Sequence, residues 1–109
     1  MSFLPLRVKA IVLNMGSAIM SVLLVTYDLN REANRPNITK KIRETGTSWA
    51  MLSESSYAIE TSRTPDDVYS ALKPLIDSND NIYIITLKKP WTGFGTKEVN
   101  DWLANKLTY

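Results

Sequence analysis

Cysteine and histidine are both absent from this chain of 109 residues. Without cysteine the chain has no disulfide, no zinc–thiolate site, no iron–sulfur ligand and no thiol nucleophile. Without histidine it cannot build a Ser-His-Asp or Cys-His arrangement, and it lacks the usual general base near neutral pH. Any catalysis must therefore use carboxylates, hydroxyls, lysines or a hard metal ion held by oxygen ligands.

The overall composition is that of one small globular domain, but its charge is unevenly distributed. Hydrophobic residues make up 44% of the chain, charged residues 22%, and the net charge is +2. The segment 31–43 holds five cationic residues and one acidic residue, whereas the segment 54–80 holds six acidic and two cationic residues. This pattern fits an anion-binding face, two oppositely charged surfaces that meet in an oligomer, or two ordinary solvated helix faces.

The uncharged run from Ala10 to Tyr27 superficially resembles a signal anchor. Asn14, Gly16 and several hydroxyl residues dilute its hydrophobicity, and its second half, residues 21–27, is typical of a buried strand. We therefore predict a cytoplasmic protein with no membrane partner. We also predict that residues 1–19 are a dispensable extension and that residues 20–109 form a single domain, because Met20 immediately precedes the strand.

The rest of the chain alternates between strand and helix patterns. The breaker cluster 34–37 opens a helix, and residues 49–60 indicate two strands or one bulged strand. Residues 82–87 form a second apolar strand pattern, and Thr96 precedes a final helix. The order β-α-β-β-α-β-α predicts an α+β fold, a ferredoxin-like βαββαβ sandwich with an added C-terminal helix.

Local signals refine two of these elements. Thr64-Pro65-Asp66-Asp67 has a hydroxyl N-cap, a proline in the first turn and acids at the positive end of the dipole, so a helix starts there. Pro74 conflicts with a regular helix to Asp77, which predicts a kink. Three aromatic residues near the end of the chain are expected to pack rather than to stack on bases; they are Trp91, Phe94 and Trp102.

Several short motifs occur together in this chain. They are Tyr27-Asp28-Leu29 at the end of a first strand, a basic first helix, the serine-interrupted segment 52–59, Ile82-Tyr83-Ile84 and the Trp-Thr-Gly-Phe…Trp-Leu ending at 91–103. Together they resemble the CRISPR-associated protein 2 family, and most closely its stand-alone SinR-like relatives, over residues 20–107. Two features depart from the family pattern. Glu32 is the one acidic residue near Asp28, and the family's Ser-Phe element is here Ser56-Tyr57.

The resemblance implies a homodimer of ferredoxin-like subunits that binds DNA or RNA. It also implies that Asp28 is a catalytic and metal-binding residue, which would hold Mg²⁺ or Mn²⁺ for a nuclease or endoribonuclease reaction; no organic cofactor is expected. The alternative for Asp28 is a carboxylate that caps its own turn. The candidate phosphate contacts are Arg31, Arg35, Lys40 and Lys41, although the same residues also suit an ordinary exposed helix face.

Three classes of function remain open at this point. The chain is an architectural nucleic-acid-binding protein, a metal-dependent nuclease, or a non-catalytic scaffold whose dimer is the functional object. A nearly neutral body with one basic helix argues against tight nonspecific DNA binding, because that affinity grows with the number of phosphates neutralised.

Overall fold

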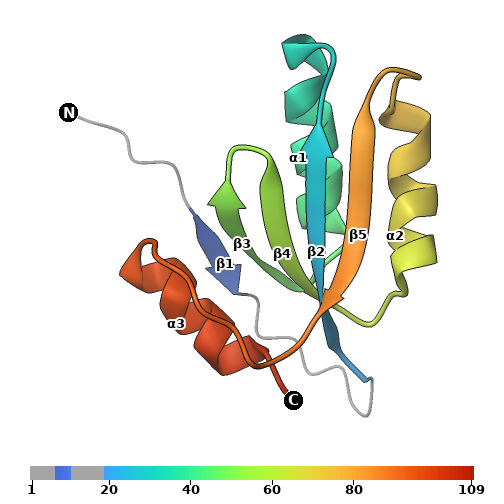
Figure 1. Cartoon of the computed structure of the whole chain (residues 1–109). Helices are drawn as coiled ribbons and strands as arrows, with labels where there is room; N and C mark the ends of the chain where they lie inside the picture. Colours follow the sequence, from blue (N-terminus) through green and yellow to red (C-terminus); the bar gives the residue numbers. More distant parts are fainter. Residues whose placement is uncertain (1–6, 11–18) are drawn as a thin grey trace.

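A computed structural model describes residues 7–10 and 19–109 of the chain (Figure 1). The elements are β1 (Val8–Ala10), β2 (Ser21–Asp28), the 3-10 turn η1 (Glu32–Asn34), α1 (Arg35–Glu44), β3 (Ser48–Ser53), β4 (Ser56–Thr61), α2 (Pro65–Leu72), the 3-10 turn η2 (Lys73–Leu75), β5 (Asn81–Leu87) and α3 (Lys97–Lys106). The predicted alternation of strands and helices is confirmed for the described residues.

The strands form one antiparallel sheet in the order β1-β3-β4-β2-β5. The fold is therefore α+β, and the order of the last four strands is compatible with a ferredoxin-like plan. The segment 49–60 forms two strands with an irregular register between Met51 and Ser53. The sequence patterns missed β1, which lies within the predicted extension and pairs with β3 at the edge of the sheet.

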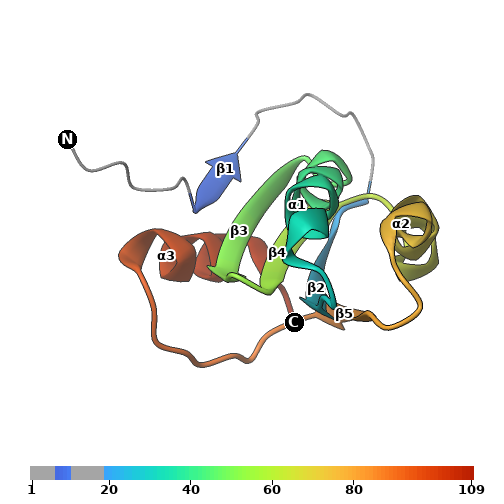
Figure 2. The same ribbon diagram turned by 90° about the horizontal axis from the view of Figure 1, so that it is seen from above.

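The helices divide between the two faces of the sheet (Figure 2). α1 and α2 cover one face, where Ile38, Ile42, Val68 and Leu72 pack against alternate residues of β2, β3 and β4. α3 lies on the other face, where Trp102 and its neighbours pack against the alternate set of sheet residues. The period-2 alternation of the strands supplies both faces, because successive side chains point to opposite sides.

Local capping explains where the helices begin. Thr64 accepts a hydrogen bond from the backbone N–H of Asp67, whose carboxylate accepts from the N–H of Thr64, which completes a capping box. At the start of α3 the cap is a single hydrogen bond, in which the Thr96 hydroxyl accepts from the backbone N–H of Val99. The predicted kink at Pro74 takes a different form: the α-helix ends at Leu72, and Pro74 lies in the 3-10 turn η2.

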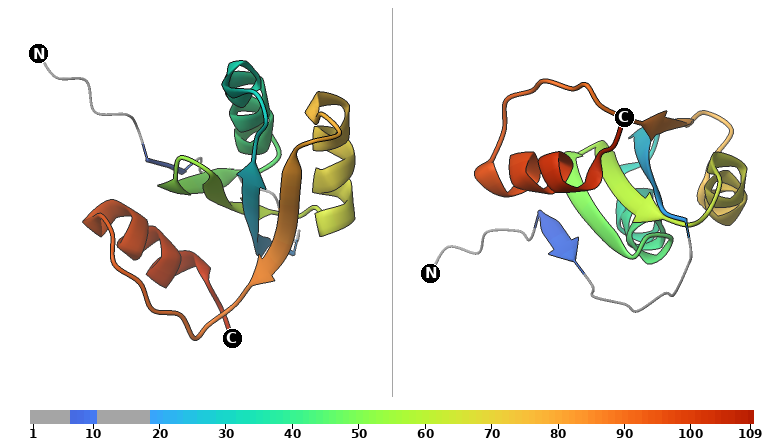
Figure 3. Two further views of the ribbon diagram at one scale, coloured as in Figure 1. Left: turned by 45° about the horizontal axis from the view of Figure 1, so that its top comes forward. Right: turned by 90° about the horizontal axis from the view of Figure 1, so that it is seen from below.

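The C-terminal end of the chain returns to the sheet after α3. The backbone N–H of Lys89, just after β5, donates to the carbonyl of Thr108 at 2.7 Å, and the C-terminus lies beside the end of β5 (Figure 3). Trp102 is buried as expected and Trp91 is half-buried. The expectation for Phe94 is wrong: its side chain is fully exposed, because it sits in an open loop between β5 and α3 rather than on a helix stripe.

No helix among the residues that the structure describes is long and apolar enough to span a membrane. The second half of the uncharged run, predicted to be a strand, is β2. The first half falls largely at residues 11–18, outside the described part of the chain.

Candidate nucleic-acid interface

Asp28 is the last residue of β2 and is exposed. Its partner in the antiparallel register is Asn81, the first residue of β5. Within residues 7–10 and 19–109, the Asp28 carboxylate makes no hydrogen bond and no ion pair with another side chain or backbone group. The turn-capping alternative therefore has no contact to support it, and the carboxylate remains accessible to a ligand.

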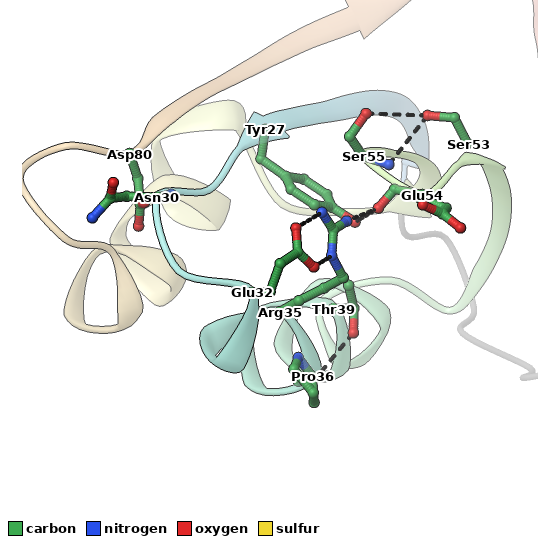
Figure 4. Close-up of polar contacts among 10 residues, drawn as sticks. All are labelled: Tyr27, Asn30, Glu32, Arg35, Pro36, Thr39, Ser53, Glu54, Ser55 and Asp80. Carbon is green, nitrogen blue, oxygen red and sulfur yellow. Dashed lines mark hydrogen bonds and ion pairs between the residues drawn. The ribbon is translucent and has the colours of Figure 1, made fainter.

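A different carboxylate, that of Asp80, organises the loop after Asp28. Its Oδ1 accepts from the backbone N–H of Asn30 at 2.6 Å; both residues are drawn in Figure 4. Its Oδ2 accepts from the backbone N–H of Asp77 at 2.8 Å. Asp77 in turn accepts from the Asn34 amide at 3.0 Å and lies 3.8 Å from Arg31. The acidic loop after α2 thus holds the start of the basic segment within one subunit, and Arg31 already has an acidic neighbour.

Arg35 is held by three groups at once (Figure 4). Its Nε and Nη2 donate to the two carboxylate oxygens of Glu32, each at 2.8 Å, and its Nη1 donates to the Glu54 carbonyl. The guanidinium also lies over the Tyr27 ring, 5.7 Å from the ring centroid. The hydrogen bond to Arg35 lowers the pKa of Glu32, and the same bond raises the pKa of Arg35. Arg35 therefore ties α1 to β2 and to the β3–β4 turn.

The Tyr27 side chain, on β2, belongs to the same cluster as Arg35 and Glu54. It is buried, and its hydroxyl donates to the Glu54 carbonyl at 2.8 Å. Burial raises the pKa of Tyr27 to about 12, because the phenolate would lose its hydration; the nearby Tyr57 adds to the rise, and Arg35 only partly offsets it.

This shift predicts a loss of stability at high pH. The unfolded chain releases the Tyr27 proton near the ordinary tyrosine pKa of 10.0, whereas the folded chain keeps it until the pH reaches about 12. The stabilisation is complete below pH 10 and declines as pH rises towards 12, by up to about 3 kcal/mol at 1.36 kcal/mol per pKa unit. Urea unfolding at several pH values from 9 to 11.5 measures this decline in the free energy of unfolding. Tyr27→Phe should show a shallower decline than the wild type, and equal declines would contradict the assignment.

The two lysine candidates point away from this cluster. Lys40 is exposed and lies on the side of α1 opposite the buried Ile38 and Ile42, as the helical period of 3.6 residues requires. Lys41 lies on another flank, with its Nζ 3.6 Å from a carboxylate oxygen of Glu44. The four candidate phosphate contacts are therefore not gathered on one surface.

Arg43, which was not predicted as a phosphate contact, lies on the same flank of α1 as Arg35. It lies two turns after Arg35, and the spacing 35–39–43 was the signal available for it. Its Nη1 donates to the Tyr57 hydroxyl at 3.2 Å, and its guanidinium lies 5.6 Å from the centroid of the Trp49 ring. Trp49 and Tyr57 pack edge to face. Among the described residues, no carboxylate forms an ion pair with Arg43.

This flank of α1 forms one wall of a groove of about 500 Å³. The opposite wall comes from β3, β4 and the turn between them. The lining residues are Glu32, Arg35, Pro36, Thr39, Arg43, Met51, Glu54 and Tyr57.

The outer face of β2 and β5 is a second accessible surface. Tyr83 and Ile85 on β5 are 64% and 51% exposed, and they lie opposite Thr26 and Leu24 of β2 in the register. We call these four residues the outer patch. α3 packs on the same face of the sheet but towards β1 and β3, so none of the described helices covers the outer patch.

The described residues contain no group of three or more acidic side chains placed to hold a metal ion together. A metal ion held by Asp28 would therefore need further ligands from outside these residues, such as the phosphate oxygens of a substrate. No protein-family model matches the chain, and no curated protein matches its sequence.

Proposed function

We propose that the protein is a homodimeric nucleic-acid-binding protein with a ferredoxin-like subunit, as the resemblance to the CRISPR-associated protein 2 family implies. The observation that carries the proposal is the cationic character of α1, and above all Lys40 and Arg43, which lie one helical turn apart. Four of its ten residues are cationic and one is acidic, and neither Lys40 nor Arg43 forms an ion pair with the described residues. Such side chains neutralise phosphates and release counterions when a nucleic acid binds.

Binding of a labelled single-stranded oligonucleotide at increasing salt tests this function. With one or two phosphates neutralised per subunit, log K should fall against log salt with a slope of about −0.7 for each phosphate. Fluorescence anisotropy measures the affinity. Binding that is absent at low salt, or that does not respond to salt, would contradict the proposal and favour the scaffold function, for which the exposed outer patch is the supporting feature.

A second candidate function is cleavage, and the accessible Asp28 carboxylate favours it. When a divalent ion is bound, it would supply charge neutralisation and an activated water, and Asp28 would help to hold it. Asp28→Asn keeps the size of the side chain but removes its charge. We therefore expect cleavage that depends on Mg²⁺ or Mn²⁺ to fall to background in this variant, with little change in thermal stability because the Asp28 carboxylate makes no hydrogen bond or ion pair among the described residues.

The cleavage assay uses end-labelled RNA and DNA with and without each metal. Glu98→Gln is the matched control, because Glu98 is an exposed acidic residue at the start of α3, on a different element from Asp28. Undiminished cleavage by Asp28→Asn would eliminate Asp28 as the metal-binding residue.

A further inference from the structure

The groove beside α1 has two charged residues that no ion pair among the described residues neutralises. Its lining includes two arginines and two glutamates. Glu32 and Arg35 neutralise each other through two hydrogen bonds of 2.8 Å. Arg43 and Glu54 remain, and neither forms an ion pair within residues 7–10 and 19–109. An incoming ligand therefore meets one free positive charge and one free negative charge.

The two free charges belong to different ends of the groove. The Glu54 backbone carbonyl is bound by Arg35, which is two turns from Arg43 along α1, or about 12 Å at 1.5 Å per residue. The stretch of α1 between the arginines exposes Pro36 and Thr39 to the groove, and β3 contributes Met51. The middle of the groove is thus mainly apolar, with a hydroxyl on one wall.

Contacts within the protein already hold the Arg43 guanidinium in a fixed orientation. The Tyr57 hydroxyl accepts from one of its N–H groups, and the Trp49 ring lies under the guanidinium. An arginine has five N–H donors in a planar fork, so four remain for a ligand. A guanidinium that is already fixed loses little rotamer freedom when it binds a planar pair of anionic oxygens, and phosphate offers such a pair.

We propose that this groove binds one nucleotide unit of a nucleic-acid strand, with its phosphate on Arg43. The inference rests on the proposed nucleic-acid-binding function and places its main contact. The apolar middle of the groove accommodates the sugar or base. The Glu54 carboxylate accepts hydrogen bonds from a sugar hydroxyl or a base amino group and repels a second phosphate. The groove therefore takes one phosphate for each subunit.

The test compares two substitutions that each remove one positive charge, one in the groove and one on the opposite face of the sheet. Arg43→Gln should weaken binding of a fluorescein-labelled single-stranded (dT)12 about fivefold to tenfold at low salt, and it should reduce the magnitude of the salt slope by about 0.7. Lys97→Gln, at the start of α3 on the opposite face of the sheet from α1, should change the affinity less than twofold. Arg43→Lys keeps the charge but loses the planar fork, so it should retain the salt slope and recover only part of the affinity.

NMR of the Trp49 indole N–H gives an independent readout, because Trp49 lies directly under Arg43. Inorganic phosphate and thymidine 5′-monophosphate should each shift this resonance in the wild type but not in Arg43→Gln, with the larger response to the nucleotide. Circular dichroism of each variant shows whether it folds.

The results of these experiments distinguish the proposed nucleotide site in the groove from the proposed nucleic-acid-binding function as a whole. Equal weakening by Arg43→Gln and Lys97→Gln would overturn the groove while leaving nucleic-acid binding intact. A shift of Trp49 by phosphate without salt-sensitive (dT)12 binding would overturn the nucleic-acid function and the nucleotide assignment together. An unperturbed Trp49 with both small probes, together with wild-type affinity in Arg43→Gln, would overturn the site.

Discussion

We propose that the homodimer forms through the outer patch, so replacing Tyr83 and Ile85 together by lysine should lower the mass of the protein in solution to that of a monomer. Both side chains are more than half exposed on the outer face of β5, so the substitutions remove little that supports the subunit's own fold. In a symmetric contact each residue is used twice. Four partly buried side chains at about 1 kcal/mol each weaken association roughly a thousandfold, and the new charges oppose one another across the axis.

Multi-angle light scattering at tens of micromolar protein measures this mass. Tyr69→Lys is a matched control, because Tyr69 is 44% exposed on α2, which lies on the opposite face of the sheet from the outer patch. It should leave the dimer unchanged. A monomeric wild type would contradict the homodimer, and a dimeric Tyr83→Lys, Ile85→Lys variant would place the contact somewhere other than the outer patch.

A chain that starts at Met20 should melt about 10 °C below the full chain. It would lack β1, whose residues pair with Ser48, Trp49 and Ala50 of β3. It would also lose the hydrogen bond from the Met51 N–H to the Arg7 carbonyl at 2.7 Å, and the contact of Val8 with the residues buried under α3. At about 1 kcal/mol for each net hydrogen bond and a similar amount for Val8, the loss is about 2 kcal/mol or more.

Thermal unfolding followed by circular dichroism measures the change. A chain that starts at Leu6 keeps the described residues 7–10 and serves as the control, and it should melt close to the full chain. An unchanged melting temperature in the chain that starts at Met20 would support the prediction that residues 1–19 are dispensable.

Part of the candidate site was accessible from the sequence and part was not. The exposed position of Asp28 at the end of a strand followed from the apolar run before it and the polar residues after it. Arg35 was chosen as a phosphate contact, but its donors are occupied by Glu32 and the Glu54 carbonyl. Glu54 is 19 residues away on a different element, so no local pattern indicates this contact. Arg43 was passed over because its neighbours Trp49 and Tyr57 meet it only after the sheet has formed.

The sequence by itself determined the local structure of this protein. The β-branched run at 21–27, the hydroxyl caps Thr64 and Thr96, and the apolar spacing of α3 act within a few residues of the chain, so their effects are readable without knowledge of the fold. Only the tertiary structure decided that β1 extends the sheet, that α3 covers the face opposite α1 and α2, and that Phe94 is exposed. These outcomes depend on which apolar surfaces meet between distant segments, and that choice is made by packing the whole chain at once rather than by any local propensity.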